Sequence, residues 1–95
     1  MKVELSREAS AQARQIDAWW RRNRRTAPEL FVRELGRAVD ALEAMPGLGV
    51  RYAPKPGVRR LLLERTRYHV YFAADAERVY VIAVWSALRG RGPAL

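Results

Sequence analysis

The sequence predicts an α+β fold of order β-α-α-β-β-β, in which an N-terminal helical hairpin packs on a mainly antiparallel four-stranded sheet. The first half carries apolar residues at helical spacing, and the second half carries runs of β-branched and aromatic residues. With 95 residues, of which 49% are hydrophobic, the chain can build one core. We therefore expect a single domain over residues 1–95, with residues 88–95 as a flexible basic tail.

The N-terminal segment predicts a short strand followed by a helix. Residues 2–5 alternate between polar and apolar side chains, and Ser6 is a suitable N-cap for a helix that reaches about residue 24. One face of this helix is apolar, with spacings of four, three and four between Ala9, Ala13, Ile16 and Trp20. Trp20 is expected in the core, whereas Trp19 points about 100° away and is either partly exposed or an anchor for a partner.

A second helix is predicted from Thr26 to the stop signal Met45-Pro46-Gly47. Thr26 can cap the helix, Pro28 suits its first turn, and Glu29 completes a capping box. Apolar residues then repeat at helical spacing, at Phe31, Leu35, Ala38, Leu42 and Met45. Because so few residues separate the two helices, we expect an antiparallel hairpin.

Three strands in a meander are predicted for the second half. Residues 47–57 contain three glycines and two prolines, which favours an irregular loop before the first of them. The last run is apolar on both faces and should lie inside the sheet. The predicted strands are 58–63, 68–72 and 79–85, with turns at 64–66 and 74–76.

The composition excludes several kinds of site. There is no cysteine, so a disulfide, a thiolate nucleophile and a Cys-ligated zinc site are excluded. His69 is the only histidine and has no neighbouring ligand at metal-binding spacing, and no glycine-rich phosphate loop precedes a capped helix. We expect no metal and no cofactor. The N-terminus lacks a signal-like apolar stretch and no run is long enough to cross a membrane, so a cytoplasmic protein without membrane contact is expected.

Basic residues are concentrated in the second half. The chain has 18 Lys and Arg against 10 Asp and Glu, a net charge of +8. Residues 47–95 hold nine basic and three acidic residues and so carry +6 of this excess. This distribution predicts an anionic partner, which the C-terminal half should contact.

The predicted strands suggest where such a partner would bind. Arg59 and Arg60 must point to opposite faces, and Arg60 faces away from the helices if Leu61 and Leu63 pack on them. Either His69 and Tyr71 or Tyr68 and Val70 then share the open face with Arg60. In the first case the face, bordered by Arg67, Arg89 and Arg91, could hold phosphates and stack a base. The alternative is that these arginines only keep an exposed sheet soluble.

The order of elements, the size and four phrases resemble the RelE/ParE superfamily of type II toxin-antitoxin toxins. The phrases are VELSREA at 3–9, VRRLLL at 58–63, RYHVYF at 67–72 and VYVIAVW at 79–85, the last followed by an Arg-rich tail. The resemblance implies a toxin of the plasmid-stabilisation type, held in a heteromeric complex by a cognate antitoxin whose acidic C-terminal segment wraps it. Its ribonuclease branch cleaves messenger RNA on the ribosome, and its ParE branch is associated with inhibition of DNA gyrase.

Individual positions favour the ParE-like branch. Arg60 matches a basic strand position of the ribonuclease branch, but His69 stands where that branch has an arginine, and no tyrosine follows Tyr80. Arg89 is also offset from the late arginine of that branch. We therefore expect a toxin that binds its target without catalysis. The candidate contacts to target or antitoxin are Trp19, Arg60, Arg67, Tyr71, Arg89 and Arg91.

Two alternatives remain open. A ribosome-dependent endoribonuclease would use Arg60, His69 and Arg89, because a histidine can serve as a general acid or base. The other alternative is an interaction module that has lost its activity.

Overall fold

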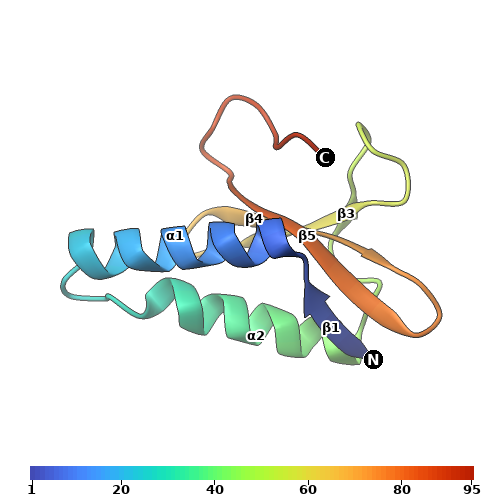
Figure 1. The fold of residues 1–95 in the computed structure, drawn as a ribbon, viewed down its shortest axis with the longest axis horizontal. Helices are drawn as coiled ribbons and strands as arrows, with labels where there is room; N and C mark the ends of the chain where they lie inside the picture. Colours follow the sequence, from blue (N-terminus) through green and yellow to red (C-terminus); the bar gives the residue numbers. More distant parts are fainter.

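The computed structural model describes residues 1–95, and two helices cover one face of a five-stranded sheet in it (Figure 1). The predicted α+β class is confirmed, with one strand more than the four expected. The sheet order is β1-β5-β4-β3-β2. The elements are β1 (Lys2–Leu5), α1 (Arg7–Asn23), α2 (Leu30–Ala44), β2 (Val50–Arg51), β3 (Arg59–Leu63), β4 (Tyr68–Ala74) and β5 (Arg78–Ser86).

Strand β5 is an inner strand, as its two apolar faces predict. It pairs in parallel with β1 on one side and antiparallel with β4 on the other, and all remaining pairs are antiparallel. Strand β1 covers only the first part of β5, from Arg78 to Val81. The later part of β5 therefore borders α1 and the C-terminal tail, where both cavities described below lie.

Strand β2 lies within the segment that was predicted to be wholly irregular, so that prediction is wrong at Val50 and Arg51. These two residues pair with Arg60 and Arg59 of β3. The guanidinium of Arg59 donates to the carbonyls of the preceding loop residues, at 2.9 Å to Gly47, 3.1 Å to Leu48 and 2.9 Å to Gly49. Arg59 thus holds the loop beside β3, where β2 pairs with that strand. The glycine and proline content of the loop does not reveal this contact.

Helix α1 begins and packs as predicted. The amide of Ala9 donates to the Ser6 side chain at 3.0 Å, which confirms the N-cap. Trp20 is 8% exposed and its indole N–H donates to the Tyr68 hydroxyl at 3.2 Å. Trp19 is 39% exposed, so the two neighbouring tryptophans divide between core and surface as expected.

Helix α2 begins at Leu30, later than the predicted Thr26 cap, and the capping box is wrong. Glu29 occupies the N-cap position but makes no side-chain cap hydrogen bond. Its carboxylate instead pairs at 3.0 Å with Arg33, one turn ahead, so it does not reach back to the Thr26 amide. Residues 24–29 form turns closed by bonds such as Ala27 N–H to the Arg24 carbonyl, and α1 and α2 still run antiparallel (Figure 1).

The main core lies between the helices and the sheet. Leu63 is buried there and Leu61 packs against it, which confirms that these leucines face the helical hairpin. Strand alternation places Phe72 of β4 in this core and Tyr71 on the opposite face. The register shift between Tyr71 and Phe72 leaves one extra residue on β5, so Val81 and Val84, three positions apart, both face the core. The core consists of Ala9, Trp20, Phe31, Leu35, Ala38, Leu42, Leu63, Val70, Phe72, Val79, Val81 and Val84. Neither helix is long and apolar enough to cross a membrane.

Candidate functional site

The strand register decides which residues share the open face of the sheet. Arg60 lies opposite Tyr71, and Leu62 lies opposite His69, across the β3–β4 pair. Cross-strand partners share a face, so Arg60, His69 and Tyr71 point away from the helices. Of the two arrangements that the sequence left open, the first is the one found.

The C-terminal tail folds back over this face. The indole N–H of Trp85 donates to the Arg91 carbonyl at 2.9 Å, and Gly92 lies so close to Tyr52 that a Cβ there would overlap the tyrosine hydroxyl. Figure 1 shows the tail leaving β5 and curving above the sheet on the side away from the helices. Tyr71, at 1% exposed, is buried in a small cluster with Val58. In this conformation Tyr71 is therefore not available to stack a base or to contact a partner.

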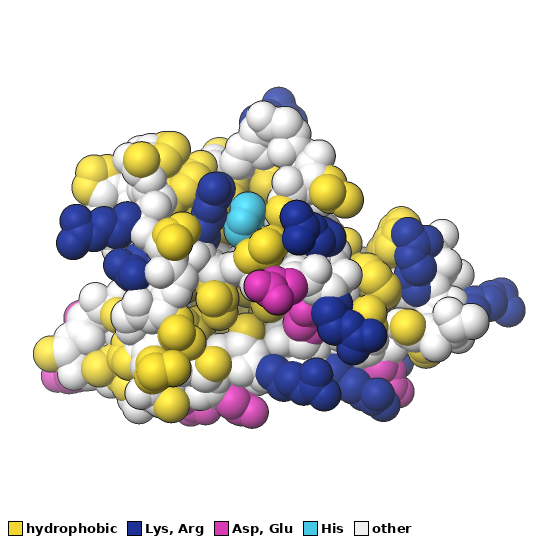
Figure 2. Space-filling model, turned by 180° about the vertical axis from the view of Figure 1, so that it is seen from behind, with side chains coloured by type: hydrophobic (Ala, Val, Ile, Leu, Met, Phe, Trp, Pro, Cys, Tyr) yellow, Lys and Arg dark blue, Asp and Glu magenta, His cyan; other side chains and the backbone are white.

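Between the sheet and the tail lies a cavity of about 250 Å³, here called the open-face cavity. No carboxylate lines it, and the four ion pairs of the protein all lie elsewhere. Figure 2 shows the cyan imidazole, the only one in the chain, at the surface with basic side chains on both sides of it. The lining residues are Arg60, His69, Tyr71, Ser86, Ala87, Arg89, Gly90, Arg91 and Gly92.

The positive charge around this cavity acts on His69. Partial burial of the imidazole lowers its pKa from the ordinary value of 6.5, and the nearby guanidinium groups of Arg60 and Arg67 lower it further. The imidazole is therefore neutral at neutral pH, with one nitrogen able to donate and the other able to accept a proton. Arg60 also lies over the ring of Tyr52, with its guanidinium carbon 5.4 Å from the ring centre.

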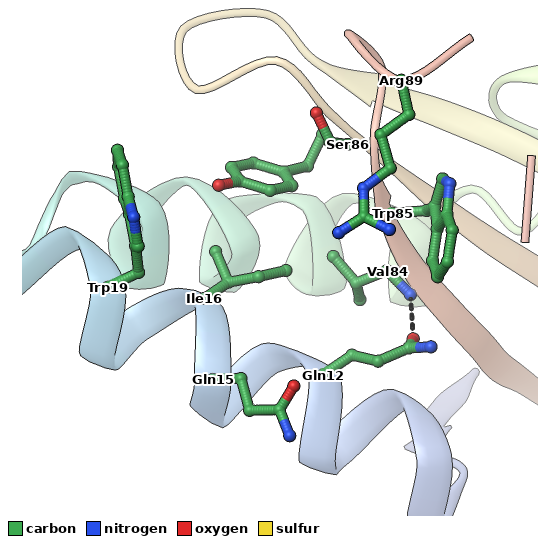
Figure 3. A pocket seen from close by; sticks show the side chains of 9 residues that line it. Gln12, Gln15, Ile16, Trp19, Val84, Trp85, Ser86 and Arg89 are labelled. Atoms are coloured by element: carbon green, nitrogen blue, oxygen red, sulfur yellow. Dashed lines mark hydrogen bonds between the residues drawn. The ribbon is translucent and has the colours of Figure 1, made fainter. Parts of the chain in front are cut away.

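A second cavity, the α1–β5 groove, lies where β5 extends beyond β1 (Figure 3). Its volume is about 390 Å³. The side-chain oxygen of Gln12 accepts from the Val84 amide at 2.8 Å, and so satisfies a strand edge that β1 leaves unpaired. The lining residues are Gln12, Gln15, Ile16, Trp19, Tyr68, Val84, Trp85, Ser86 and Arg89.

Arg89 connects the two cavities, since it lines both. In Figure 3 its guanidinium points into the α1–β5 groove, and its carbon lies 4.4 Å from the ring centre of Trp85. Trp19 lies at the opposite end of the same groove. Arg89 thus shares the groove with Trp19, and it also borders the open-face cavity that Arg60, His69 and Arg91 line.

The model of one protein family, the ParE toxin of the type II toxin-antitoxin system parDE, matches residues 3–90. The chain belongs to this family. The predicted resemblance to the RelE/ParE toxins, and among them to the ParE-like branch, is confirmed. No curated protein matches the chain in sequence. A solved structure, the chromosomal ParDE toxin-antitoxin system from P. aeruginosa, is similar in fold with a TM-score of 0.68 and 22% identity, over 90% of this chain and 95% of that one.

Two features of this ParE-family chain were missed from the sequence. Gln12 borders the apolar face of α1, between Ala9 and Ile16, and a polar residue in that position was a signal for a buried hydrogen bond. The folding of the tail onto Tyr52 had no comparable signal, because it depends on the absence of a side chain at Gly92. Arg67, also a predicted contact, lines neither cavity; it has a φ of 68° and its carbonyl accepts from the Ala87 amide at 2.8 Å.

Proposed function

We propose that this ParE-family chain is a toxin that arrests growth by binding and inhibiting DNA gyrase in the cytoplasm, and that a cognate antitoxin neutralises it. The family match over residues 3–90 carries this proposal. The departures from the ribonuclease branch also support it: His69 replaces an arginine, and no tyrosine follows Tyr80.

The α1–β5 groove suits the antitoxin. Its walls combine an apolar part, from Ile16 and the exposed Trp19, with the Arg89 guanidinium. An acidic, amphipathic peptide matches this combination, because its apolar side chains would cover Ile16 and Trp19 while a carboxylate pairs with Arg89. The tryptophan is the expected energetic anchor, since aromatic residues dominate such interfaces.

The proposed cellular activity is tested by inducible expression and by a supercoiling assay with purified protein. Expression should arrest growth and induce a DNA-damage response, co-expression of the antitoxin should restore growth, and the pure toxin should block gyrase supercoiling. Normal supercoiling at saturating toxin would contradict the gyrase proposal. Harmless overexpression of folded protein would identify an inactive interaction module instead.

The antitoxin surface is tested by titration calorimetry. Trp19→Ala should lower the affinity for the antitoxin by at least about tenfold, and Arg89→Gln should lower it by a similar factor. The matched controls are Val32→Ala, another exposed apolar residue, and Arg37→Gln, an exposed arginine in no ion pair; both lie on α2 away from the groove. Equal losses in the control variants would argue against the groove.

Messenger RNA cleavage is a second candidate, because Arg60, His69 and Arg89 all line the open-face cavity. A neutral imidazole there could accept a proton from a ribose hydroxyl. The orientation of Arg89 toward the groove weakens this candidate. It predicts site-specific transcript cleavage that His69→Ala abolishes, so intact transcripts during growth arrest would exclude it.

A further inference from the structure

The open-face cavity collects positive charge that nothing in the protein neutralises. Arg60 and Arg91 line it together with the half-buried His69, and neither arginine takes part in an ion pair. Arg89 borders it too, although its guanidinium points into the α1–β5 groove. Like charges gathered around a partly desolvated site destabilise the free protein, and this cost is recovered when an anion binds. Burial is the main cause of the lowered pKa of His69, and the Arg60 guanidinium of the same cavity lowers that pKa further.

The shape of the cavity limits the anion. At about 250 Å³ it is smaller than the usual pocket for a whole small molecule and suits a single charged group with its attachment. A carboxylate offers its two oxygens in one plane, whereas a phosphodiester of a nucleic acid backbone has four oxygens at the corners of a tetrahedron, two of them non-bridging and charged. The donors come from three separate segments, Arg60 from β3, His69 from β4 and Arg91 from the tail, and such a set suits a tetrahedral group better than a planar one.

We propose that the open-face cavity binds a phosphate group of a single-stranded nucleic acid, with Arg60, His69 and Arg91 as ligands and the folded tail as one wall. Arg60 is held in place over Tyr52, and Arg91 is placed by the bond from the Trp85 indole to its carbonyl. The neutral imidazole supplies a hydrogen bond without adding charge. This inference concerns binding alone and does not depend on gyrase being the target.

The chain's single histidine makes the test direct, because its imidazole resonances can be followed by NMR without overlap from another histidine. The probes are inorganic phosphate, a short oligothymidylate and a glutamate oligopeptide of equal charge. The oligonucleotide should shift the His69 resonances to saturation and raise the pKa of the imidazole, because a bound anion offsets the neighbouring guanidinium groups. The two phosphate probes are compared at equal concentrations of phosphate groups. Equal binding of inorganic phosphate would identify free phosphate as the ligand and contradict the proposal, whereas tighter binding of the oligonucleotide would support a nucleic acid backbone.

Variants identify the ligands of the phosphate. Arg60→Gln and Arg91→Gln should each lower the affinity for the oligonucleotide about tenfold, as the loss of one charge-assisted hydrogen bond does. The control Arg37→Gln should leave that affinity within about twofold of the parent protein's. An equal loss of affinity in Arg37→Gln would show that net charge alone explains the effect, and would overturn the proposal. Binding of the glutamate peptide as tight as that of the oligonucleotide would overturn it too, in favour of an acidic protein segment.

The role of the tail is tested without changing any charge. In Gly92→Ala the added methyl overlaps the Tyr52 hydroxyl, so the tail or Tyr52 with its stacked arginine must move, and oligonucleotide affinity should fall several-fold. Adding Tyr52→Phe removes the obstructing oxygen and should restore affinity, while Tyr52→Phe alone should bind normally. Unchanged binding by Gly92→Ala, with the same urea midpoint as the parent protein, would show that the tail forms no part of the site.

Discussion

Gly49 lies where the loop after α2 turns against strand β3. Its φ of 77° is in the left-handed region, and a Cβ at this position would overlap the backbone carbonyl oxygen of Arg60. Gly49→Ala should therefore lower the free energy of unfolding by about 2–3 kcal/mol, through backbone strain and loss of the β2–β3 pairing. Urea denaturation measures this change.

The matched control for this substitution is Gly36→Ala. Gly36 lies in the exposed middle of α2, and no atom lies within 4 Å of a Cβ built there. The alanine should stabilise the helix by about 0.5–1 kcal/mol, because it reduces the backbone entropy lost on folding. If both substitutions changed stability in the same direction, the strain assigned to Gly49 would be refuted.

His69 should make the stability of the protein depend on pH. Burial, then Arg60 and Arg67, lower its pKa below 6.5 in the folded state, so between the folded value and 6.5 the unfolded chain binds more protons. Stability is therefore fully present above pH 6.5 and falls as the pH drops through this window. His69→Gln should remove that slope in urea midpoints measured against pH.

Asp75 titrates in a different pH range. Its pKa is lowered by bonds from the Glu77 and Arg78 amides, so it affects stability only near and below its ordinary value of 3.8, outside the histidine window.

At the scale of elements, one carboxylate connects α2 to the turn between β3 and β4. Glu34 accepts from the Arg65 amide at 2.8 Å, from the Thr66 amide at 3.0 Å and from the Thr66 hydroxyl. Thr66 is the only buried polar residue, at 7% exposed, so removing its partner leaves unsatisfied donors. Glu34→Ala should cost about 2–3 kcal/mol in urea unfolding, and Glu34→Gln less because one acceptor remains.

The exposed neighbour Glu64, which makes no side-chain hydrogen bond or ion pair, provides the control for Glu34. Glu64→Ala should change the free energy of unfolding by less than about 0.5 kcal/mol. A loss as large as that of Glu34→Ala would mean that the general loss of negative charge from this basic protein, and not the contact with Thr66, controls stability.

The elements that periodicity predicts are those whose packing is local or strongly patterned. Helix α1 with its Ser6 cap and the inner position of β5 were predictable because side-chain pattern alone decides them. The start of α2 and strand β2 were not predictable in this way. Glu29 pairs forward with Arg33, and β2 pairs with β3 at a place where Arg59 also bonds the loop carbonyls, a contact between residues far apart in the loop and the strand.

The candidate site shows the same division. That Arg60 and His69 share a face required only the strand alternation and one choice of register. The burial of Tyr71 depends on Tyr52 and Val58, which precede β3 and pack on it through long-range contacts that no local pattern encodes. The direction of the Arg89 guanidinium, over Trp85 and into the α1–β5 groove, was not encoded in a local pattern either.

At the scale of the whole molecule, positive charge greatly exceeds what internal ion pairs can balance. The net charge is +8, and the four ion pairs use only Glu4, Asp17 and Glu29 as acids. Most of the arginines therefore face solvent or a cavity without a carboxylate partner. Their combined field should speed the approach of any polyanion and should be screened by salt.

Association with an acidic antitoxin should consequently depend strongly on ionic strength. Between about 0.01 M and 0.15 M salt the Debye length falls from about 30 Å to about 8 Å, so the association rate should fall at least about tenfold while the dissociation rate changes little. Stopped-flow tryptophan fluorescence, to which the exposed Trp19 contributes together with Trp20 and Trp85, measures both rates. The double variant Arg89→Gln/Arg91→Gln should reduce the slope of rate against salt more than Arg22→Gln/Arg37→Gln, which removes the same charge from the helices. Equal slopes in the two double variants would show that net charge alone steers the partner, and a salt-independent rate would contradict an electrostatic role for the C-terminal half.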